Sequence, residues 1–291
     1  MSETTYQLIA IGVYFAAMIA IGHYAYTRTR NIDGYVLAER GLHPAVAALS
    51  ANAADMSGWL LMGLPGAIYA SGLIEAWIAI GLTIGAWLNW KFIAPRLRAY
   101  TEIAGDSITI PSYFGRRLRD RTNLLRITAA LIILAFFTFY VSSGMVAAGK
   151  FFEGSFGWTY LNGVLLVALV GLVLALDPDS AILELVAFAW AGFGAAFGPI
   201  ILLSLYWRRL TANGALAGMI VGAVTVFVWG NIDSLSDRMY EIVPGFLLNL
   251  LVAVVVSLAQ RTDDPGIGEE FDRMERDLAR DRGDIDLTTA P

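Results

Sequence analysis

The sequence contains no cysteine and only two histidines, His23 and His43. The lack of cysteine excludes disulfide bridges, thiolate zinc sites and a cysteine nucleophile, and two histidines are too few for most metal sites. The chain also has no Walker loop, no His-Glu metal-binding pair and no Gly-x-Ser-x-Gly elbow. We therefore expect no enzymatic activity, and the net charge of -5 argues against a nucleic-acid partner.

Charge is scarce as well. Charged residues make up 15% of the chain and hydrophobic residues 57%, and the mean hydropathy is +0.61. A soluble domain usually carries roughly 25% charged residues. About 20 consecutive apolar residues are enough for a helix to cross a bilayer. We expect an all-α, polytopic membrane helix bundle of seven or eight spans embedded in the lipid bilayer, formed by the apolar runs 7–27, 44–64, 72–94, 127–149, 157–176, 181–206, 213–230 and 241–259.

The basic residues predict the orientation of these spans. All but two of the 20 Lys and Arg residues lie in 28–43, 91–126 and 207–212 or beyond residue 260. Basic loops resist translocation, so these segments are expected in the cytoplasm, with the N-terminus outside the plasma membrane and the tail inside. The run 157–176 conflicts with this assignment, because the turns on both sides of it look external. Either this run does not span or the last three helices insert against their charge bias, and seven spans satisfy the charges.

The tail, residues 261–291, differs in composition from the rest of the chain. It is rich in acidic residues and also contains arginine, proline and glycine. Such mixed charge is typical of solvated segments. We expect a disordered cytoplasmic extension in which a short helix can form near 268–280.

One carboxylate, Asp55, lies inside the run 44–64, in the string Ser50-Ala-Asn-Ala-Ala-Asp-Met-Ser-Gly58. A carboxylate at that depth costs at least about 2.5–3.5 kcal/mol, so it usually faces a partner or an ion path. The small and polar residues around it would let the helix open, and freed backbone carbonyls could then coordinate a cation. The alternative is an aspartate that is hydrogen-bonded within the bundle for packing.

Three other segments have simpler interpretations. Gly63-Leu-Pro-Gly66 is either a hinge or a plain helix-ending turn. Tyr140, which precedes two serines, is explained on spacing alone by hydrogen bonding between helices. The small residues of Ala189–Pro199 and Gly214–Gly222 favour close helix packing over a ligand site.

Long strings within Ser50–Trp90, Ala189–Pro199, Asn213–Met219 and Tyr240–Gly245 resemble the sodium:solute symporter family, and the similarity extends through nearly all of residues 5–260. The resemblance implies the inverted-repeat fold shared with leucine-type transporters. It also implies symport of proline, or of a similar small solute, coupled to the sodium ion.

The resemblance also assigns roles to residues around the carboxylate. It implies that the backbone carbonyls of Ala53 and Met56 bind sodium and that Asp55 supports this ion site. Ser57 and Gly58 would lie near the bound proline, with Trp59 adjacent. Tyr140 would line the substrate cavity, and Arg40 would lie in a cytoplasmic loop that influences coupling. Ala54 departs from the family, whose members often carry serine at this position.

The chain is shorter than family members by a long internal segment. The junction falls near Tyr160-Leu161, so residues 1–160 correspond to family helices 1–4 and residues 161–260 to helices 10–13. By the same resemblance, the missing part contains hydroxyls that complete the sodium site and aromatic residues that close over the substrate. The expected fold is therefore an incomplete inverted repeat. Two alternatives to transport follow: a non-transporting, internally deleted remnant or structural membrane protein, and a half-transporter that is active only as a homo-oligomer.

Overall fold

The computed structural model describes residues 3–28, 41–55, 57–167, 182–260 and 265–281 of the chain. Across these residues the regular structure is entirely helical, which confirms the all-α prediction. Six of the described helices are long and apolar enough to cross a membrane, so the chain is a polytopic membrane protein. They are Thr5–Arg28, Leu73–Ile103, Leu124–Phe156, Leu185–Tyr206, Ala212–Gly230 and Ile242–Ala259.

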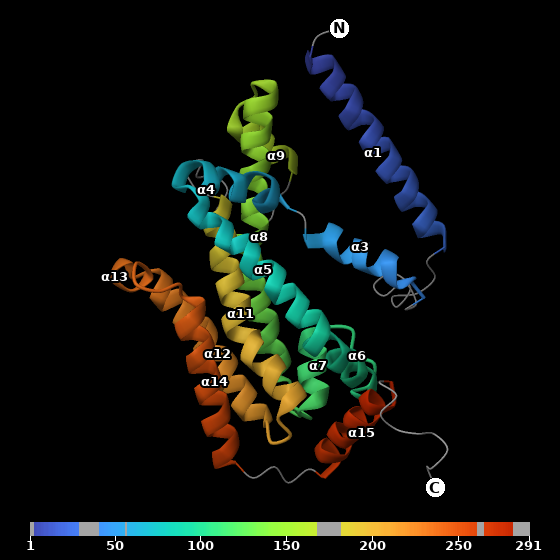
Figure 1. Ribbon diagram of the computed structural model, residues 1–291, viewed down its shortest axis with the longest axis vertical. Coiled ribbons are helices and arrows are strands. Elements are labelled where there is room, and N and C mark those ends of the chain that lie inside the picture. Colours follow the sequence, from blue (N-terminus) through green and yellow to red (C-terminus); the bar gives the residue numbers. More distant parts are fainter. Residues whose placement is uncertain (1–2, 29–40, 56, 168–181, 261–264, 282–291) are drawn as a thin grey trace.

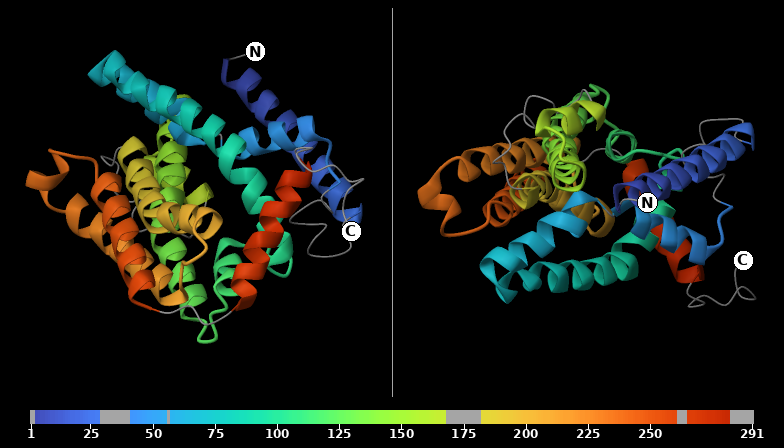
Figure 2. Two further views of the ribbon diagram at one scale, coloured as in Figure 1. Left: turned by 60° about the horizontal axis from the view of Figure 1, so that its bottom comes forward. Right: turned by 90° about the horizontal axis from the view of Figure 1, so that it is seen from above.

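The helices fall into a central bundle and a group beside it (Figures 1 and 2). The bundle consists of α8 (Leu124–Phe156), α11 (Ile182–Tyr206), α12 (Ala212–Gly230) and α14 (Ile242–Ala259). Beside it lie α1 (Glu3–Arg28), α3 (Pro44–Asp55), the π-helix η2 (Trp59–Gly63), α4 (Leu64–Ser71), the short 3₁₀ helix η3 (Leu73–Glu75) and α5 (Ala76–Leu88). At one end of the bundle are the π-helix η4 (Asn89–Ile93), α6 (Ala94–Ile103), α7 (Ile110–Arg117) and α15 (Pro265–Asp281), and at the other end α9 (Tyr160–Val167) and α13 (Asp233–Ser236).

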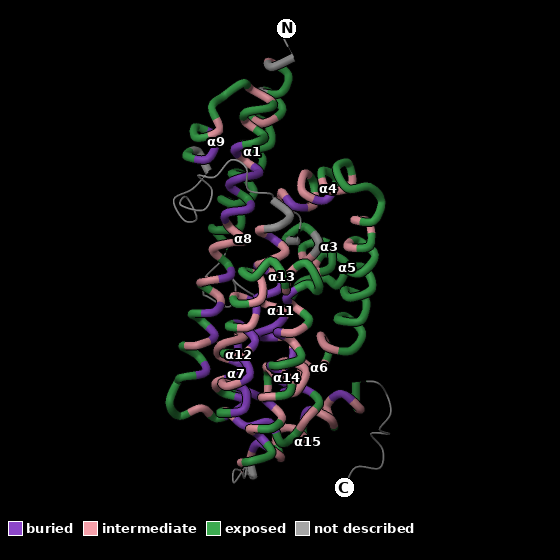
Figure 3. Tube along the Cα trace, turned by 90° about the vertical axis from the view of Figure 1, so that its left-hand side faces the viewer, coloured by how far each residue is buried: buried purple, intermediate pink, exposed green. Residues whose placement is uncertain are grey.

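Small residues allow the bundle helices to approach closely, as the packing interpretation predicts. A Cβ atom added at Gly222 of α12 would lie 2.4 Å from the main-chain oxygen of Ala195 in α11. One added at Gly218 would lie 2.3 Å from Oδ1 of Asn249 in α14. Side chains larger than hydrogen would push these helices apart, so the glycines set the spacing around which the buried core forms (Figure 3).

Helices α8 and α11 run antiparallel. Phe139 of α8 packs against Phe188 of α11 with ring centroids 4.8 Å apart, and Phe136, further back in α8, packs against Phe193, further on in α11, at 6.2 Å. Helix α8 therefore ends, and α11 begins, at the same end of the bundle. This arrangement favours the seven-span interpretation, in which the run 157–176 does not cross. Of that run, residues 168–176 lie outside the described residues, and α9 packs back against the end of α8.

The run 44–64 is not one continuous helix. Helix α3 ends at Asp55, Ser57 is not helical, and a helical path resumes with η2 at Trp59. The chain then passes through Gly63–Gly66 without interruption and stays helical to Ser71, so the helix-ending alternative for this segment is wrong.

Each of the two π-helices is followed, two residues later, by a proline. In η2 the N–H of Leu64 donates to the oxygen of Trp59, just before Pro65. In η4 the N–H of Ala94 donates to the oxygen of Asn89, just before Pro95. Proline has no N–H and its ring collides with the carbonyl four residues earlier, so a wider turn before it relieves both problems.

The tail contains a packed helix, where disorder was expected. The helix predicted near 268–280 is present as α15, but the expectation of disorder is wrong across residues 265–281. The helix is held by an apolar stripe that packs against α6 and the core. The stripe consists of Ile267, Phe271, Met274 and Leu278, which are spaced three or four residues apart. Residues 282–291 lie outside the described residues.

Candidate functional site

Most of the predicted site residues lie in or directly beside the interruption between α3 and η2. Ala53 lies in the last turn of α3 and is exposed, and Asp55 is the final residue of that helix. The side chain of Asp55, the whole of Met56 and the loop with Arg40 lie outside the described residues. The predicted roles of these residues therefore stay predictions, whereas the opening of the helix at this string is a structural finding.

Immediately after the break, the chain packs closely against α8. A Cβ atom added at Gly58 would lie 2.4 Å from Cβ of Ala147, so only glycine allows this approach. The main-chain oxygen of Ser57 accepts a hydrogen bond from the N–H of Leu60 at 3.1 Å. The Ser57 hydroxyl is buried and has no hydrogen-bond partner among the described residues. An unpaired buried hydroxyl is available to a polar ligand.

Trp59 and Tyr140 are brought together, although they are far apart in the sequence. Trp59 is 7% exposed and belongs to one apolar cluster with Tyr140 of α8 and Val186 of α11. Its ring meets that of Trp190 edge-on, with centroids 4.7 Å apart and an interplanar angle of 81°. Directly after the break, Trp59 thus packs with aromatic side chains from two bundle helices.

Trp190 was missed by the sequence analysis, which treated Ala189–Pro199 as packing residues. One feature of the sequence could have indicated its role. Trp190 is the only tryptophan in a string of mostly alanine and glycine, and such small neighbours leave space for another aromatic ring to pack against it. The hydroxyls of Ser142 and Ser143 donate to main-chain oxygens of α8 itself, those of Thr138 at 2.9 Å and Tyr140 at 2.6 Å.

This arrangement can bind a small ligand between polar and apolar surfaces. Non-helical backbone in a membrane protein exposes carbonyl oxygens, which are suitable ligands for a monovalent cation. The described residues contain no group of three or more His, Asp or Glu side chains that could hold a metal ion. The polar groups that could bind a ligand at this site are therefore the main-chain oxygens and hydroxyls near Ser57. The side chains of Trp59, Tyr140 and Trp190 form the apolar side of the site.

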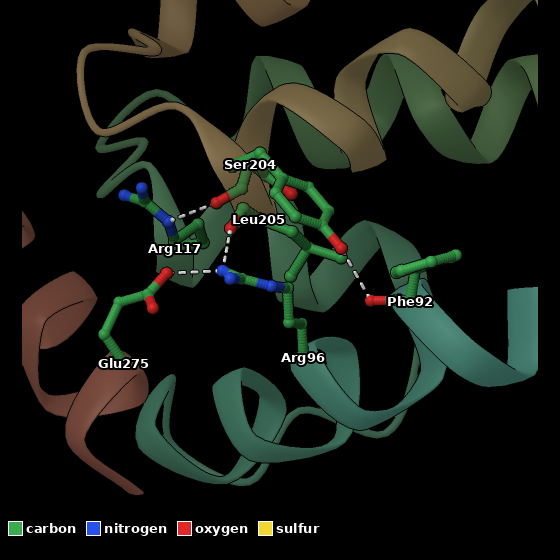
Figure 4. A network of polar contacts seen from close by, with 7 residues as sticks. Phe92, Arg96, Arg117, Ser204, Leu205 and Glu275 are labelled. Atoms are coloured by element: carbon green, nitrogen blue, oxygen red, sulfur yellow. Dashed lines mark hydrogen bonds and ion pairs between the residues drawn. The ribbon is translucent and has the colours of Figure 1, made fainter. Parts of the chain in front are cut away.

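A second polar network joins α6, α7, α11 and α15 at the far end of the bundle (Figure 4). Arg96 donates to the main-chain oxygen of Leu205 at 3.1 Å and to Glu275 at 2.5 Å. Arg117 is fully buried, and its Nε donates to the main-chain oxygen of Ser204 at 3.3 Å. These contacts satisfy carbonyls at the end of α11, where intrahelical partners run out.

Tyr113 belongs to the same network and lies outside the candidate spans. Its hydroxyl is 3.1 Å from Oγ of Ser204. Burial raises the pKa of Tyr113 to about 12, although the Ser204 hydrogen bond and the nearby Arg117 cation act in the opposite direction. The phenol therefore stays neutral at physiological pH and serves as a hydrogen-bonding group.

An interrupted helix that packs against a bundle of apolar helices is a feature of secondary transporters. The chain belongs to the sodium:solute symporter family, whose family model matches residues 35–173 and 163–222. It is 30% identical to the osmoregulated proline transporter OpuE of Bacillus subtilis, with 94% of this chain and 99% of the relative covered. It is likewise 30% identical to the sodium/proline symporter of Salmonella typhimurium, with 93% and 96% covered.

The relatives are longer than this chain. The alignment with the Bacillus transporter extends over 485 positions, whereas the chain has 291 residues, so a long stretch of the relative has no counterpart here. A stretch of 163 residues is 52% identical to the sodium/proline symporter of Staphylococcus aureus and covers 32% of that protein. The two segments matched by the family model meet near the junction predicted at Tyr160-Leu161. No solved structure matches the chain.

Proposed function

We propose that this protein carries proline, or a similar small solute, across the plasma membrane together with sodium. The observation that carries the proposal is the interruption of the helix at Ser57. The following segment, η2, packs against α8 and α11, and the buried Ser57 hydroxyl has no hydrogen-bond partner among the described residues. The names of the relatives, proline transporters and sodium/proline symporters, support the choice of solute and ion. The proposal involves no catalytic residue.

The chemistry of the site fits these two ligands. Sodium is a hard cation that prefers oxygen, and the carbonyls of Ala53 and Met56 are the proposed ligands, with Asp55 supplying negative charge nearby. Proline has charged carboxylate and ammonium groups and an apolar ring. In the proposed arrangement Ser57 and the backbone at Gly58 meet the charged groups. Trp59 and Tyr140 form the apolar wall, and Arg40 acts from the loop before α3.

The long stretch absent from this chain favours two further candidates. Alternating access needs two repeats that move against each other around a central site, and here one repeat keeps its opening helices and the other its last ones. The second candidate is therefore a half-transporter whose site is completed by another copy of the chain. The third is a structural membrane protein without transport. None of the most apolar window of Leu73–Ile103 is buried, so this surface is free to meet lipid or another copy.

Uptake of labelled proline into liposomes that contain the purified chain tests the proposal. We expect uptake above that of empty liposomes, with collapse when the sodium gradient is removed. Asp55→Ala should abolish this uptake. Glu75→Ala is the matched control, since Glu75 lies at the start of a helix away from the break, and it should leave uptake unchanged.

Each outcome separates the candidates. No uptake by protein that unfolds cooperatively on heating would identify a non-transporting protein. Uptake that appears only after two copies are cross-linked would identify the half-transporter. Equal loss in the Asp55 and Glu75 variants would contradict the proposed ion site while leaving transport itself intact as a conclusion.

A further inference from the structure

Helix α15 carries six acidic residues and three arginines. On the side toward the bundle, Glu270 pairs with Arg119 at 3.1 Å, Asp272 with Arg208 at 3.0 Å and Glu275 with Arg96 at 2.5 Å. These three arginines belong to three separate parts of the chain: the loop after α7, the loop after α11, and α6. Three of the six acidic residues of the helix thus help to dock it against the bundle.

The opposite face of α15 carries a row of arginines together with two carboxylates, Glu269 and Asp277. Arg273, Arg276 and Arg280 are exposed, and their spacing of three and four residues places them on one ridge of the helix. The Arg273 side chain is 67% exposed. When α15 docks through Glu270, Asp272 and Glu275, the ridge of arginines on its other side faces outward, although the tail as a whole is acidic.

A groove of about 730 Å³ lies between this ridge and α6. Four cations line it: Lys91 and Arg98 from the η4–α6 side, and Arg273 and Arg280 from α15. Three carboxylates also line it. Glu102 pairs with Arg98, Asp277 lies 4.0 Å from Arg273, and Asp281 is at the end of α15. Lys91 and Arg280 form no ion pair with any described residue. The four cations exceed the three carboxylates by one positive charge, beside an apolar floor of Pro95, Ala99, Ile103 and Leu278.

The groove opens where an apolar helix leaves the hydrocarbon. Helix α5 continues through η4 into α6 as the candidate span Leu73–Ile103. Trp87 and Trp90 precede Lys91 and are 57% and 60% exposed, and the Lys91 ammonium lies 4.7 Å above the Trp87 ring. Exposed tryptophans at the end of a span lie at the level of the phospholipid headgroups. Lys91 is therefore held at the depth of the lipid phosphates.

We propose that the groove between α6 and α15 binds the phosphate-bearing headgroup of an anionic phospholipid. Lys91 and Arg280 contact the phosphate, with Arg98 and Arg273 contributing longer-range attraction. The apolar floor accommodates the start of the acyl chains. Bound lipid links α6 to α15 and so supports the docked tail helix. This site is independent of proline transport and exists in any of the functional candidates above.

Lipid retention by the full chain in detergent tests the proposal. Purified protein is incubated with phosphatidylglycerol or phosphatidylcholine, and bound lipid is counted by native mass spectrometry, with and without inorganic phosphate. We expect selective retention of phosphatidylglycerol. The double variant Lys91→Gln/Arg280→Gln should weaken it by about fivefold for each cation removed. The charge-preserving variant Lys91→Arg/Arg280→Lys should restore it.

Arg126→Gln/Arg238→Gln is the matched control, because it removes two exposed arginines outside the groove. Retention in this control should equal that of the unmodified chain. Equal retention of the two lipids, or equal retention by the double variant and the control, would overturn the proposal. Displacement of the lipid by inorganic phosphate at millimolar concentration would assign the site to free phosphate instead. Thermal unfolding without added lipid verifies that each variant is folded.

Discussion

Asn249 is a polar residue in the middle of the apolar helix α14, and its environment explains its presence. Pro199 in α11 has no N–H, so the carbonyl of Ala195, four residues earlier, lacks its helical partner. The Asn249 side-chain amide donates to that oxygen at 2.7 Å and to the oxygen of Ala196 at 2.9 Å. A proline in a membrane helix is tolerated here because a neighbouring helix supplies the missing donor.

Replacing Asn249 by leucine should destabilise the protein. The change leaves the Ala195 carbonyl buried without a partner, which costs about 1–3 kcal/mol. Thermal unfolding in detergent measures the loss. Asn231→Ala is the control, because Asn231 is exposed and donates only within its own helix end, to the oxygen of Phe227 at 2.7 Å. Equal effects of the two substitutions would refute the assigned role.

Asp120 should make the start of α8 sensitive to acid. Burial of Asp120 acts to raise its pKa, but hydrogen bonds from Thr122 and from the backbone N–H of Leu125 outweigh it and lower the pKa below its ordinary value of 3.8. A carboxylate whose folded pKa is depressed contributes stability above the unfolded value and loses it as the pH falls through the folded value.

Asp120→Asn should therefore lower stability at neutral pH by about 0.5–2 kcal/mol, as the loss of a helix-capping group does. The difference from the unmodified chain should shrink as the pH falls below 3.8. Unfolding temperatures at pH 7 and pH 3 measure this. Asp237→Asn, at an exposed carboxylate near α13, should show no such pH-dependent difference. A gap that persists unchanged at pH 3 would contradict the capping role.

At the scale of elements, continuous apolar helices were predictable and their interruptions only partly so. The runs 213–230 and 241–259 differ by one residue at most from Ala212–Gly230 and Ile242–Ala259, because polar residues bound both. The opening near Asp55 was predicted from small and polar residues. The π-turns before Pro65 and Pro95 were not, since a proline alone does not specify how a helix adjusts around it.

The neighbours of the candidate site could not be predicted for a different reason. Trp59, Tyr140 and Trp190 meet only because three helices pack around one cluster, and no local pattern encodes that contact. Arg117 illustrates the same limit. As one of several basic residues in 91–126 it indicated orientation, yet it is fully buried beneath α15, with its guanidinium 4.7 Å above the Tyr100 ring.

Helix α15 should be held by forces that salt weakens. Its three ion pairs to the bundle involve side chains that are 15–55% exposed, and each such pair contributes roughly 0.2–1 kcal/mol, less at high ionic strength. Because the chain has no cysteine, Met274→Cys, at a fully buried position, reports undocking by maleimide labelling. We expect labelling to accelerate several-fold at high salt and, at low salt, in the added variant Glu275→Gln.

Ala215→Cys in α12 is the matched buried control, and its labelling should stay slow at every salt concentration. If Met274→Cys and Ala215→Cys respond to salt alike, general loosening of the protein explains the effect. If neither responds, the apolar stripe alone holds α15.

At the scale of the whole molecule, the basic residues gather at one end of the bundle. The loop between α6 and α8 lies at this end together with Arg208 and with α15, as their ion pairs require. The antiparallel course of α8 and α11 makes this possible. The distribution of Lys and Arg along the sequence predicted that one side of the membrane is basic. The packing of phenylalanines between α8 and α11 explains how basic residues before and after 157–181 come to lie at the same end of the bundle.

This arrangement predicts opposite accessibility for two turns. Thr159 follows α8 and Arg209 follows α11, and both residues are exposed. Because α8 and α11 run antiparallel, their last residues lie at opposite ends of the bundle (Figure 1). In right-side-out vesicles, a membrane-impermeant maleimide should label Thr159→Cys and leave Arg209→Cys unmodified until the membrane is opened. Labelling of both cysteines from the same side would contradict the antiparallel arrangement in the membrane and would mean that 157–176 crosses.

The gathering of basic residues at one end has an electrical consequence. Across an energised membrane, each elementary charge moved through the full potential changes the energy by about 2.3 kcal/mol per 100 mV. When the cytoplasm is negative, the membrane potential lowers the energy of the orientation that places α6, α7 and the arginine ridge of α15 on the cytoplasmic side. The inverted orientation is raised in energy by the same potential. The membrane potential therefore acts continuously on the folded protein to favour one orientation, and energised cells should hold a more uniform population than depolarised ones.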